Sequence, residues 1–255
     1  VKQKQQKFLL GLTKSHFWCK IEHIILNNQQ ERRMRQMNFG FSSGLEYRLG
    51  KNGTAAIVSI GSCTDKHIIV PEFIDGKTVT AIDDLAFFNA ESLVSISLPH
   101  TVSSIGKKAF AWCRKLEFVK MTGVIELCDK AFMGCHSLTD ITLGSKMRRI
   151  GKKAFAYCIE LSSASLPSGI IEIGASAFEG CRNLESISMP ESLKIIESGM
   201  FYACTNLRKV SMPETIRYIN ENSFAYCISL EDINIPKCAV VNRNAFFESY
   251  VNIAS

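Results

Sequence analysis

Apolar residues recur along most of this chain with a period of about 23 residues. An Ala-Phe pair, or a close variant of it, returns eight times in register, and successive phenylalanines are 22 or 23 residues apart. Self-similarity at such a period is typical of a repeat array, in which each unit buries its core only by stacking against its neighbours. The phenylalanines are Phe87, Phe110, Phe132, Phe155, Phe178, Phe201, Phe224 and Phe246.

Each unit reads approximately I-G-x-x-A-F-x-x-C-x-x-L-x-x-I-x-L-P-x-x-V-x-x, and residues 150–172 are the clearest copy. The segment L-x-x-I-x-L ends in alternating apolar positions, as in Leu138, Ile141 and Leu143, and this alternation predicts a short strand with one buried face. A second extended piece follows, for example residues 102–105. The A-F-x-x-C stretch fits either a short helical turn or a tight loop, with the phenylalanine in the core. The intervening glycines are expected to allow a sharp turn, and they are Gly106, Gly151 and Gly174.

These elements predict an α/β repeat solenoid, mostly β, whose parallel strands stack about 4.8 Å apart into one continuous sheet. Residues 81–255 are expected to form about seven repeats of 23 residues. Residues 38–80 predict two strands joined by a turn at 51–53, and a third strand at 68–71. Because a solenoid needs its first core covered, we expect this β segment to be an N-terminal cap.

Residues 1–37 show no repeat register, and they carry the whole charge excess of the chain. They hold eight Lys and Arg against two Glu, a net charge of +6, which equals the net charge of all 255 residues. Residues 38–255 are therefore formally neutral, which removes the main argument for nucleic-acid binding by the body. Three interpretations of this basic arm stay open: a short amphipathic helix, a disordered segment, or translation that begins at Met34 or Met37.

The repeat unit resembles the BspA-like type of leucine-rich repeat, and the resemblance covers roughly residues 40–250. The upstream stretch from residue 44, with its I-D-G-K-T-V-T-A-I sequence, is similar to the segment that commonly precedes such arrays. The resemblance implies a curved, right-handed solenoid with a parallel sheet on the concave face. It also implies surface adhesion and protein binding, in bacteria and some protists, without catalysis. No functional residue is carried over, because the shared motif positions are core positions.

Ten cysteines raise the question of disulfides or a metal site. Six of them share one position of the repeat, where a free cysteine behaves as a small buried residue, so we expect a structural ladder without bonds. The other four fit no zinc spacing. The histidines share no register, and no nucleophile or phosphate-binding motif is present. We therefore predict no enzyme activity, no metal and no cofactor. The ladder consists of Cys113, Cys135, Cys158, Cys181, Cys204 and Cys227.

The residues that flank the central Ile of each L-x-x-I-x-L strand are predicted to point into solvent. Most of them are small and polar, so a solvated sheet that binds nothing is one interpretation. Phe118 is the exception, because it is an exposed aromatic beside Lys120, and exposed aromatics are typical binding anchors. The candidate binding residues on this face are Phe118, Lys120, Asp140, Thr142, Lys209, Asp232 and Asn234.

A second candidate surface lies at the repeat edge just before the cysteine ladder. It carries Trp112, Tyr157 and Tyr226, with Tyr202 one place earlier. A stacked aromatic row could bind a protein or a glycan, but we favour the interpretation that these rings cover the repeat corners. Residues 107–108 and 152–153 are lysine pairs on the same edge, and they predict a modest basic strip suited to a glycan or an acidic protein.

Taken together, the patterns predict a non-catalytic, adhesion-type solenoid that recognises a protein or glycan on its concave face or edge. The alternative is an intracellular scaffold for protein–protein interaction. We expect a monomer that binds no nucleic acid, and no stretch approaches the roughly 20 apolar residues of a membrane helix. The resemblance suggests a cell-surface or secreted location, although no signal peptide is readable in the chain. The sequence leaves open whether the array continues past Ser255.

Overall fold

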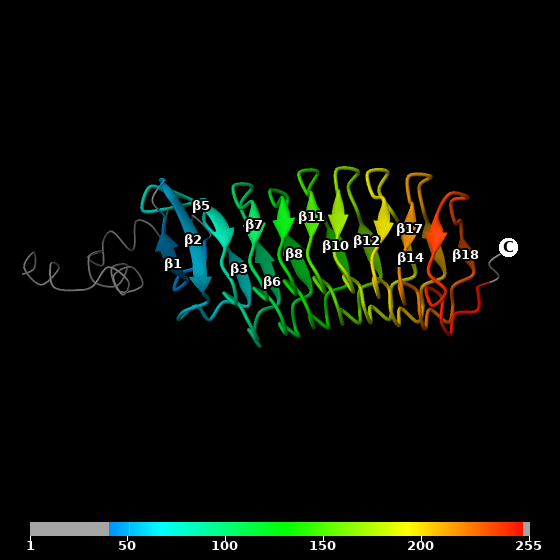
Figure 1. Cartoon of the computed structure of the whole chain (residues 1–255). Helices are drawn as coiled ribbons and strands as arrows, with labels where there is room; N and C mark the ends of the chain where they lie inside the picture. The colour runs from blue at the N-terminus through cyan, green and yellow to red at the C-terminus, as the bar shows by residue number, and fades with distance from the viewer. Residues whose placement is uncertain (1–40, 51, 252–255) are drawn as a thin grey trace, which may run out of the picture.

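The computed structural model describes residues 41–50 and 52–251. These residues form one elongated row of stacked coils, with the N-terminal part at one end and the C-terminal part at the other (Figure 1). The predictions for the basic arm, including a start at Met34 or Met37, lie outside the described residues.

Each coil of the array contributes two short strands, which stack into two separate columns (Figure 1). The first column contains the predicted L-x-x-I-x-L strands: β6 (Ser95–Ser97), β8 (Phe118–Lys120), β10 (Asp140–Thr142), β12 (Ser163–Ser165), β14 (Ser186–Ser188), β16 (Lys209–Ser211) and β18 (Asp232–Ile233). The second column contains β7 (Ser104–Ile105), β9 (Glu126–Leu127), β11 (Arg149–Ile150), β13 (Glu172–Ile173), β15 (Ile195–Ile196), β17 (Tyr218–Ile219) and β19 (Val240–Val241).

Strands pair in parallel with the equivalent strand of the next coil, as predicted, so that Asp140 lies opposite Ser163 and Ile141 opposite Ala164. The predicted single continuous sheet is wrong, because the chain runs through two columns and the pairing in each is interrupted. The first column comprises β3-β6-β8, β10-β12 and β14-β16-β18, and the isolated bridge between Met121 and Leu143 joins the coils of β8 and β10.

The repeated phenylalanines form one interior column, as the periodicity predicts. Neighbouring rings from Phe87 to Phe246 stack with centroids 4.9–5.6 Å apart and planes within 16° of parallel. From Phe87 to Phe224 each ring is at most 1% exposed. Burying such a side chain contributes about 1.5–3 kcal/mol, and here the burial requires the coils above and below. Stacking of the coils is therefore the main source of the core.

The described residues contain no helix, so the helical part of the predicted α/β class is absent. In most coils the residue before the Ala-Phe pair and the second residue after its phenylalanine have left-handed backbone, as Lys153 with φ 53° and Tyr157 with φ 60° show. Only three residues remain between them, too few for a helix. The stretch instead forms consecutive tight turns, in which Ala156 N–H donates to the carbonyl of Lys153 at 3.2 Å.

The glycines that follow the second strands have a different role from the predicted one. Gly106 and Gly151 do not have positive φ values, so a sharp turn does not require them. A Cβ atom at Gly106 would lie 2.5 Å from the backbone nitrogen of Asp84, and one at Gly151 would lie 2.6 Å from that of Asp129. These glycines are required because two successive coils approach closely at this point.

The N-terminal strands lie where the sequence places them. β1 (Glu46–Leu49) pairs antiparallel with β2 (Thr54–Ser59), which forms the predicted hairpin. β4 (Phe73–Ile74) pairs antiparallel with β5 (Lys77–Ile82), and β2 and β5 lead into the second column. β3 (His67–Ile69) begins the first column, and Ser42 N–H donates to the carbonyl of Ile69 at 3.0 Å along its outer edge.

Candidate interaction surface

The outward residues of the first strand column form the strand face, and their exposure follows the predicted alternation. In β8 and β10 the central residue is buried, and its two neighbours are exposed. The face includes all seven residues that the sequence analysis selected from these strands and from the position after β18. The coils bring these residues into rows along the solenoid, one coil apart.

Several selected residues on the strand face are engaged with other groups of the chain. Asp140 accepts hydrogen bonds from the hydroxyls of Ser163 at 2.7 Å and Thr142 at 3.2 Å. Lys209 and Asp232 form an ion pair at 2.5 Å between neighbouring strands. Asn234 donates to the carbonyl of Met212 at 2.7 Å and accepts from its N–H at 3.0 Å. A ligand at these positions would have to displace bonds that the fold already makes.

Phe118 differs from the rest of its row because it offers apolar surface. Its side chain is 52% exposed, although the equivalent residue of the preceding strand is Ser95. Lys120 lies two residues further along the same strand, and no carboxylate of the described residues lies within ion-pair distance of it. Phe118 and Lys120 therefore remain available for contact with a partner.

The predicted aromatic edge lies at a strained backbone position. Trp112, Tyr157 and Tyr226 have left-handed φ values of 65°, 60° and 59°. Gly134 and Gly180 occupy the same position in the intervening coils and tolerate this conformation without a Cβ clash. A non-glycine residue here costs about 1 kcal/mol, so the aromatic rings are not explained by backbone preference.

Two of these rings lie on the glycine of the following coil. A Cβ atom at Gly134 would lie 2.4 Å from Cε3 of Trp112, and one at Gly180 would lie 2.8 Å from Cδ1 of Tyr157. Glycine in alternate coils thus provides the flat surface that a bulky ring requires. The contact is consistent with the expectation that these rings cover the repeat corners.

The other tyrosines continue the edge by packing on one another. Tyr202 and Tyr226 meet edge to face at 5.3 Å, and Tyr226 meets Phe247 in the same way at 5.6 Å. The Tyr157 hydroxyl donates a short hydrogen bond to Glu179, which raises the pKa of Tyr157, and Lys153 forms an ion pair with Glu179 at 3.0 Å. These contacts hold the aromatic edge rigid.

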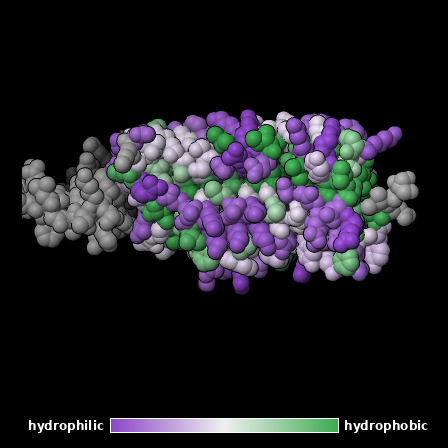
Figure 2. Space-filling model, viewed as in Figure 1, coloured by the Kyte–Doolittle hydropathy of each residue, from purple (hydrophilic) through white to green (hydrophobic). Residues whose placement is uncertain are grey.

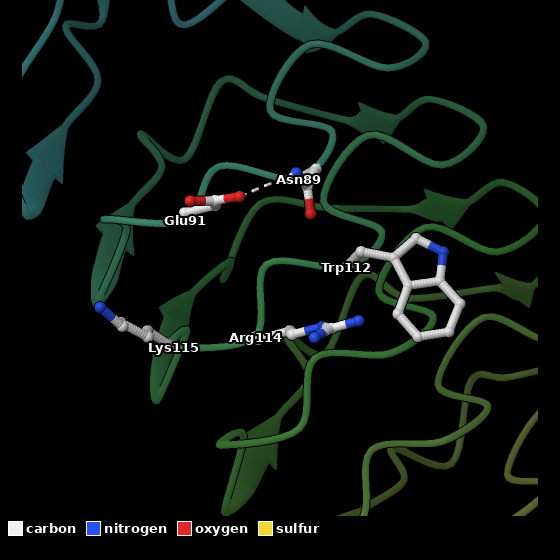
Figure 3. Close-up of a pocket in the computed structure, with 5 residues that line it drawn as sticks. All are labelled: Asn89, Glu91, Trp112, Arg114 and Lys115. Carbon is white, nitrogen blue, oxygen red and sulfur yellow. Dashed lines mark hydrogen bonds between the residues drawn. The ribbon is translucent and has the colours of Figure 1, made fainter.

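Trp112 borders an open depression of about 530 Å³ (Figure 3). Asn89 and Glu91 from the preceding coil form one side and share a hydrogen bond of 3.4 Å. Arg114 and Lys115 complete the lining, and the guanidinium carbon of Arg114 lies 5.8 Å from the centroid of the Trp112 ring. Asn89 and Gly134 occupy the position of Trp112 in the preceding and following coils. The short side chain of Asn89 leaves space on one side of the indole, and Gly134 lies against the ring on the other side.

The sequence analysis missed the polar lining of this depression. Asn89, Glu91, Arg114 and Lys115 follow no repeat pattern, and only their place beside Trp112 in two stacked coils brings them together. All four residues lie within two positions of the cysteine-ladder position of their coil, and this shared location was the signal from which the sequence could have predicted them.

A further exposed column lies on the second set of strands and was also not predicted. Ile195, Tyr218 and Val240 are in cross-strand register, and they are 36%, 52% and 63% exposed. Figure 2 shows hydrophobic surface toward the C-terminal end of the molecule, and further patches near its middle and toward the other end. The equivalent residues of three earlier coils, Glu126, Arg149 and Glu172, are charged, and Arg149 pairs with Glu172 at 3.6 Å.

The cysteine ladder is a structural element with no reactive thiol. Each ladder thiol donates to the carbonyl of a phenylalanine in the preceding coil, as Cys158 does to Phe132 at 3.2 Å. Burial raises the pKa of Cys113, Cys158 and Cys227 to about 12, so these thiols are neutral near pH 7. The nine cysteines among the described residues are free, which agrees with the predicted ladder without bonds.

Within residues 41–50 and 52–251, no group of three or more His, Cys, Asp or Glu side chains could hold a metal ion. No helix of this part of the chain is long and apolar enough to cross a membrane.

The chain matches a family model described as the BspA type leucine rich repeat region, over residues 59–129 and 125–252. No curated protein matches it.

Solved structures support this match. A leucine-rich repeat protein of T. pallidum is 31% identical over 73% of this chain and 88% of its own, with a TM-score of 0.67. A leucine-rich repeat protein of Bacteroides ovatus is 27% identical, with a TM-score of 0.75. The second match covers 82% of this chain and 56% of that protein, so this chain spans little more than half the length of that relative.

Proposed function

Because the chain belongs to the family of BspA type leucine-rich repeat proteins, we propose that it is a rigid binding module of the adhesion type that recognises a protein. Solenoids of this family generally serve protein interaction and are typically non-catalytic. A preformed array loses little conformational entropy when a partner binds, which favours affinity. The proposed partner lies outside the cell, and the chain acts as a monomer.

The observation that carries this proposal is the concentration of binding-type side chains in residues 112–120. This segment contains Trp112 and Arg114 at the depression, and it ends in exposed Phe118 and Lys120. Tryptophan and arginine are enriched among the residues that dominate binding energy. Equivalent positions in other coils are mostly small or polar, for example Ser163 in the row of Phe118.

The remaining parts of the fold have supporting roles in this proposal. Residues 38–80 act as the N-terminal cap, because the hairpin of β1 and β2 and the backbone of Ser42 cover the outermost strands of the two columns. The coils are right-handed, and the strand face is the concave one, as the family resemblance implies.

Substitution of the aromatic edge tests the proposal. We expect Trp112→Ala combined with Arg114→Ala to weaken partner binding at least tenfold, about 1.4 kcal/mol. Ala203 already occupies the position of Trp112 with φ 57°, so the backbone accepts alanine there. Phe118→Ser, which restores the residue common in its row, is expected to weaken binding as well. Partners are captured from extracellular and surface proteins by cross-linking, purified, and measured by calorimetry against the full chain.

Tyr218→Ala is the matched control, because Tyr218 is an aromatic residue in the other strand column and is as exposed as Phe118. If the control and the Trp112 variant lose affinity to the same extent, residues 112–120 are not the contact surface. If no extracellular protein binds the full chain, the adhesion proposal itself fails.

A further inference from the structure

Charge is unevenly distributed along the solenoid, although its total is zero. Residues 107–171 hold eleven Lys and Arg against five Asp and Glu, a net charge of +6. Residues 38–106 and residues 172–255 each carry a net charge of −3. The middle coils therefore form a basic belt between two acidic ends, and a field of one sign attracts a partner of the other.

Five lysines of this belt meet at one corner of three successive coils, which we call the lysine corner: Lys107, Lys108, Lys130, Lys152 and Lys153. Backbone hydrogen bonds place them side by side. Lys108 N–H donates to the carbonyl of Asp129 at 3.0 Å, and Lys130 N–H donates to the carbonyl of Lys152 at 2.8 Å. The lysine positions thus follow one another along the solenoid axis.

Most of these ammonium groups have no internal counter-ion. Of the five corner lysines, only Lys153 has a carboxylate of the described residues within ion-pair distance, that of Glu179 at 3.0 Å. Asp84 and Asp129 lie beside the corner, where one carboxylate oxygen of each accepts a hydrogen bond from a backbone N–H, that of Lys107 at 2.6 Å and that of Lys152 at 2.8 Å. Both carboxylates keep their negative charge, but neither lies within ion-pair distance of a corner lysine, so four amino groups remain available to an external anion.

Backbone preference does not explain lysine at this corner. Lys108, Lys130 and Lys153 have left-handed φ values of 55°, 61° and 53°. Other coils place Gly199 and Asn222 there, which adopt this conformation more readily, and also Leu85 and Ser176, which do not. The three lysine coils accept about 1 kcal/mol of strain each and place a cation at this position.

We propose that the lysine corner binds a linear sulfated polysaccharide that lies along the solenoid axis. A lysine ammonium is a point charge with no preferred plane, so a row of lysines that continues from coil to coil suits the successive sulfate groups of a linear polyanion.

Binding of heparin to the full chain, measured by calorimetry over a range of salt concentrations, tests this inference. The corner variant is Lys108→Asn, Lys130→Asn and Lys152→Gln, in which asparagine suits the left-handed positions. The control variant is Lys66→Gln, Lys194→Gln and Lys237→Gln, which removes the same charge from exposed lysines elsewhere. Circular dichroism checks that both variants fold.

We expect heparin to bind the wild type in a salt-dependent manner, and the corner variant to lose about one unit of the log–log salt slope for each contact removed. The control is expected to keep its affinity within twofold. Absence of heparin binding, or equal losses in both variants, overturns the proposal. Binding of poly-glutamate or duplex DNA as tight as that of heparin also overturns it, in favour of an acidic protein or a nucleic acid.

The inference is independent of the proposed protein partner. Trp112→Ala with Arg114→Ala is expected to leave heparin binding within about twofold, whereas the corner variant is expected to leave protein binding intact. Failure of one proposal can therefore be distinguished from failure of the other.

Discussion

At the scale of single residues, the contacts of the ladder thiols explain why cysteine recurs at one repeat position, which the composition alone does not. Cys158 is fully buried, and its thiol donates to the carbonyl of Phe132, so it is both a small core residue and a hydrogen-bond donor. Ser249 takes the same position in the final coil, and its hydroxyl donates to the carbonyl of Phe224. Small size and, in most coils, a donor to this carbonyl are therefore what the position provides, and sulfur chemistry is not needed.

Substitution of Cys158 tests this role. We expect Cys158→Ala to lower the free energy of unfolding by about 1–2 kcal/mol, because it removes a buried hydrogen bond and some packing. Cys158→Ser is expected to cost less, because the hydroxyl can donate to the same carbonyl, as it does at Ser249. Urea unfolding followed by circular dichroism measures both. A serine variant that is less stable than the alanine variant would contradict a donor role.

At the scale of one element, the strands gain their stability from the central inward residue. That residue is buried Ile or Val in β6, β8, β10, β14 and β16. β12 has Ala164 instead, and this side chain packs against the core while remaining partly exposed. The β12 coil therefore buries less apolar surface than its neighbours.

We expect Ala164→Val to raise the free energy of unfolding by about 1 kcal/mol, because it adds buried apolar volume and a β-branched residue in a strand. Thermal unfolding of the full chain provides the measurement. Ser165→Val is the control, because Ser165 is the exposed neighbour in the same strand, and little change is expected there. Destabilisation by Ala164→Val would show that the coil has no room for the larger side chain.

At the scale of the whole molecule, each coil contacts only its neighbours, so equivalent residues act together. The ladder thiols are one such set. Burial raises the pKa of Cys113, Cys158 and Cys227 from 9.0 to about 12 in the folded chain. In the unfolded chain these thiols return to the ordinary value, so the two states bind different numbers of protons at alkaline pH.

This difference predicts alkaline unfolding. Below pH 9 the thiols are neutral in both states, and their contribution to stability is fully present. Between pH 9 and 12 only the unfolded chain ionises, so each thiol removes about 1.4 kcal/mol of stability per pH unit. Urea midpoints under reducing conditions are expected to fall steeply above pH 9. Replacement of these three cysteines by serine is expected to flatten the fall, and an unchanged slope would exclude the thiols as its cause.

The sequence by itself determined the repeat, the core and the inward and outward faces of the strands. A period of 23 residues with phenylalanine in register can bury its apolar positions only by stacking, so the column from Phe87 to Phe246 followed from the pattern. Exposure of Phe118 followed from strand alternation. The cysteine ladder was likewise visible as one repeated position.

Only the tertiary structure decided how neighbouring coils meet. Of the two predicted alternatives for the A-F-x-x-C stretch, a helical turn or a tight loop, the structure has tight turns because of left-handed residues such as Lys153 and Tyr157, and sequence propensity does not favour either residue there. The need for glycine at Gly151 comes from the backbone of the preceding coil. The depression beside Trp112 likewise joins Asn89 and Arg114, which lie in different coils and follow no shared pattern. The sequence pattern predicts which side chains are buried within a repeat. Which side chains meet on the surface depends on the distances between neighbouring coils, and the pattern does not contain these distances.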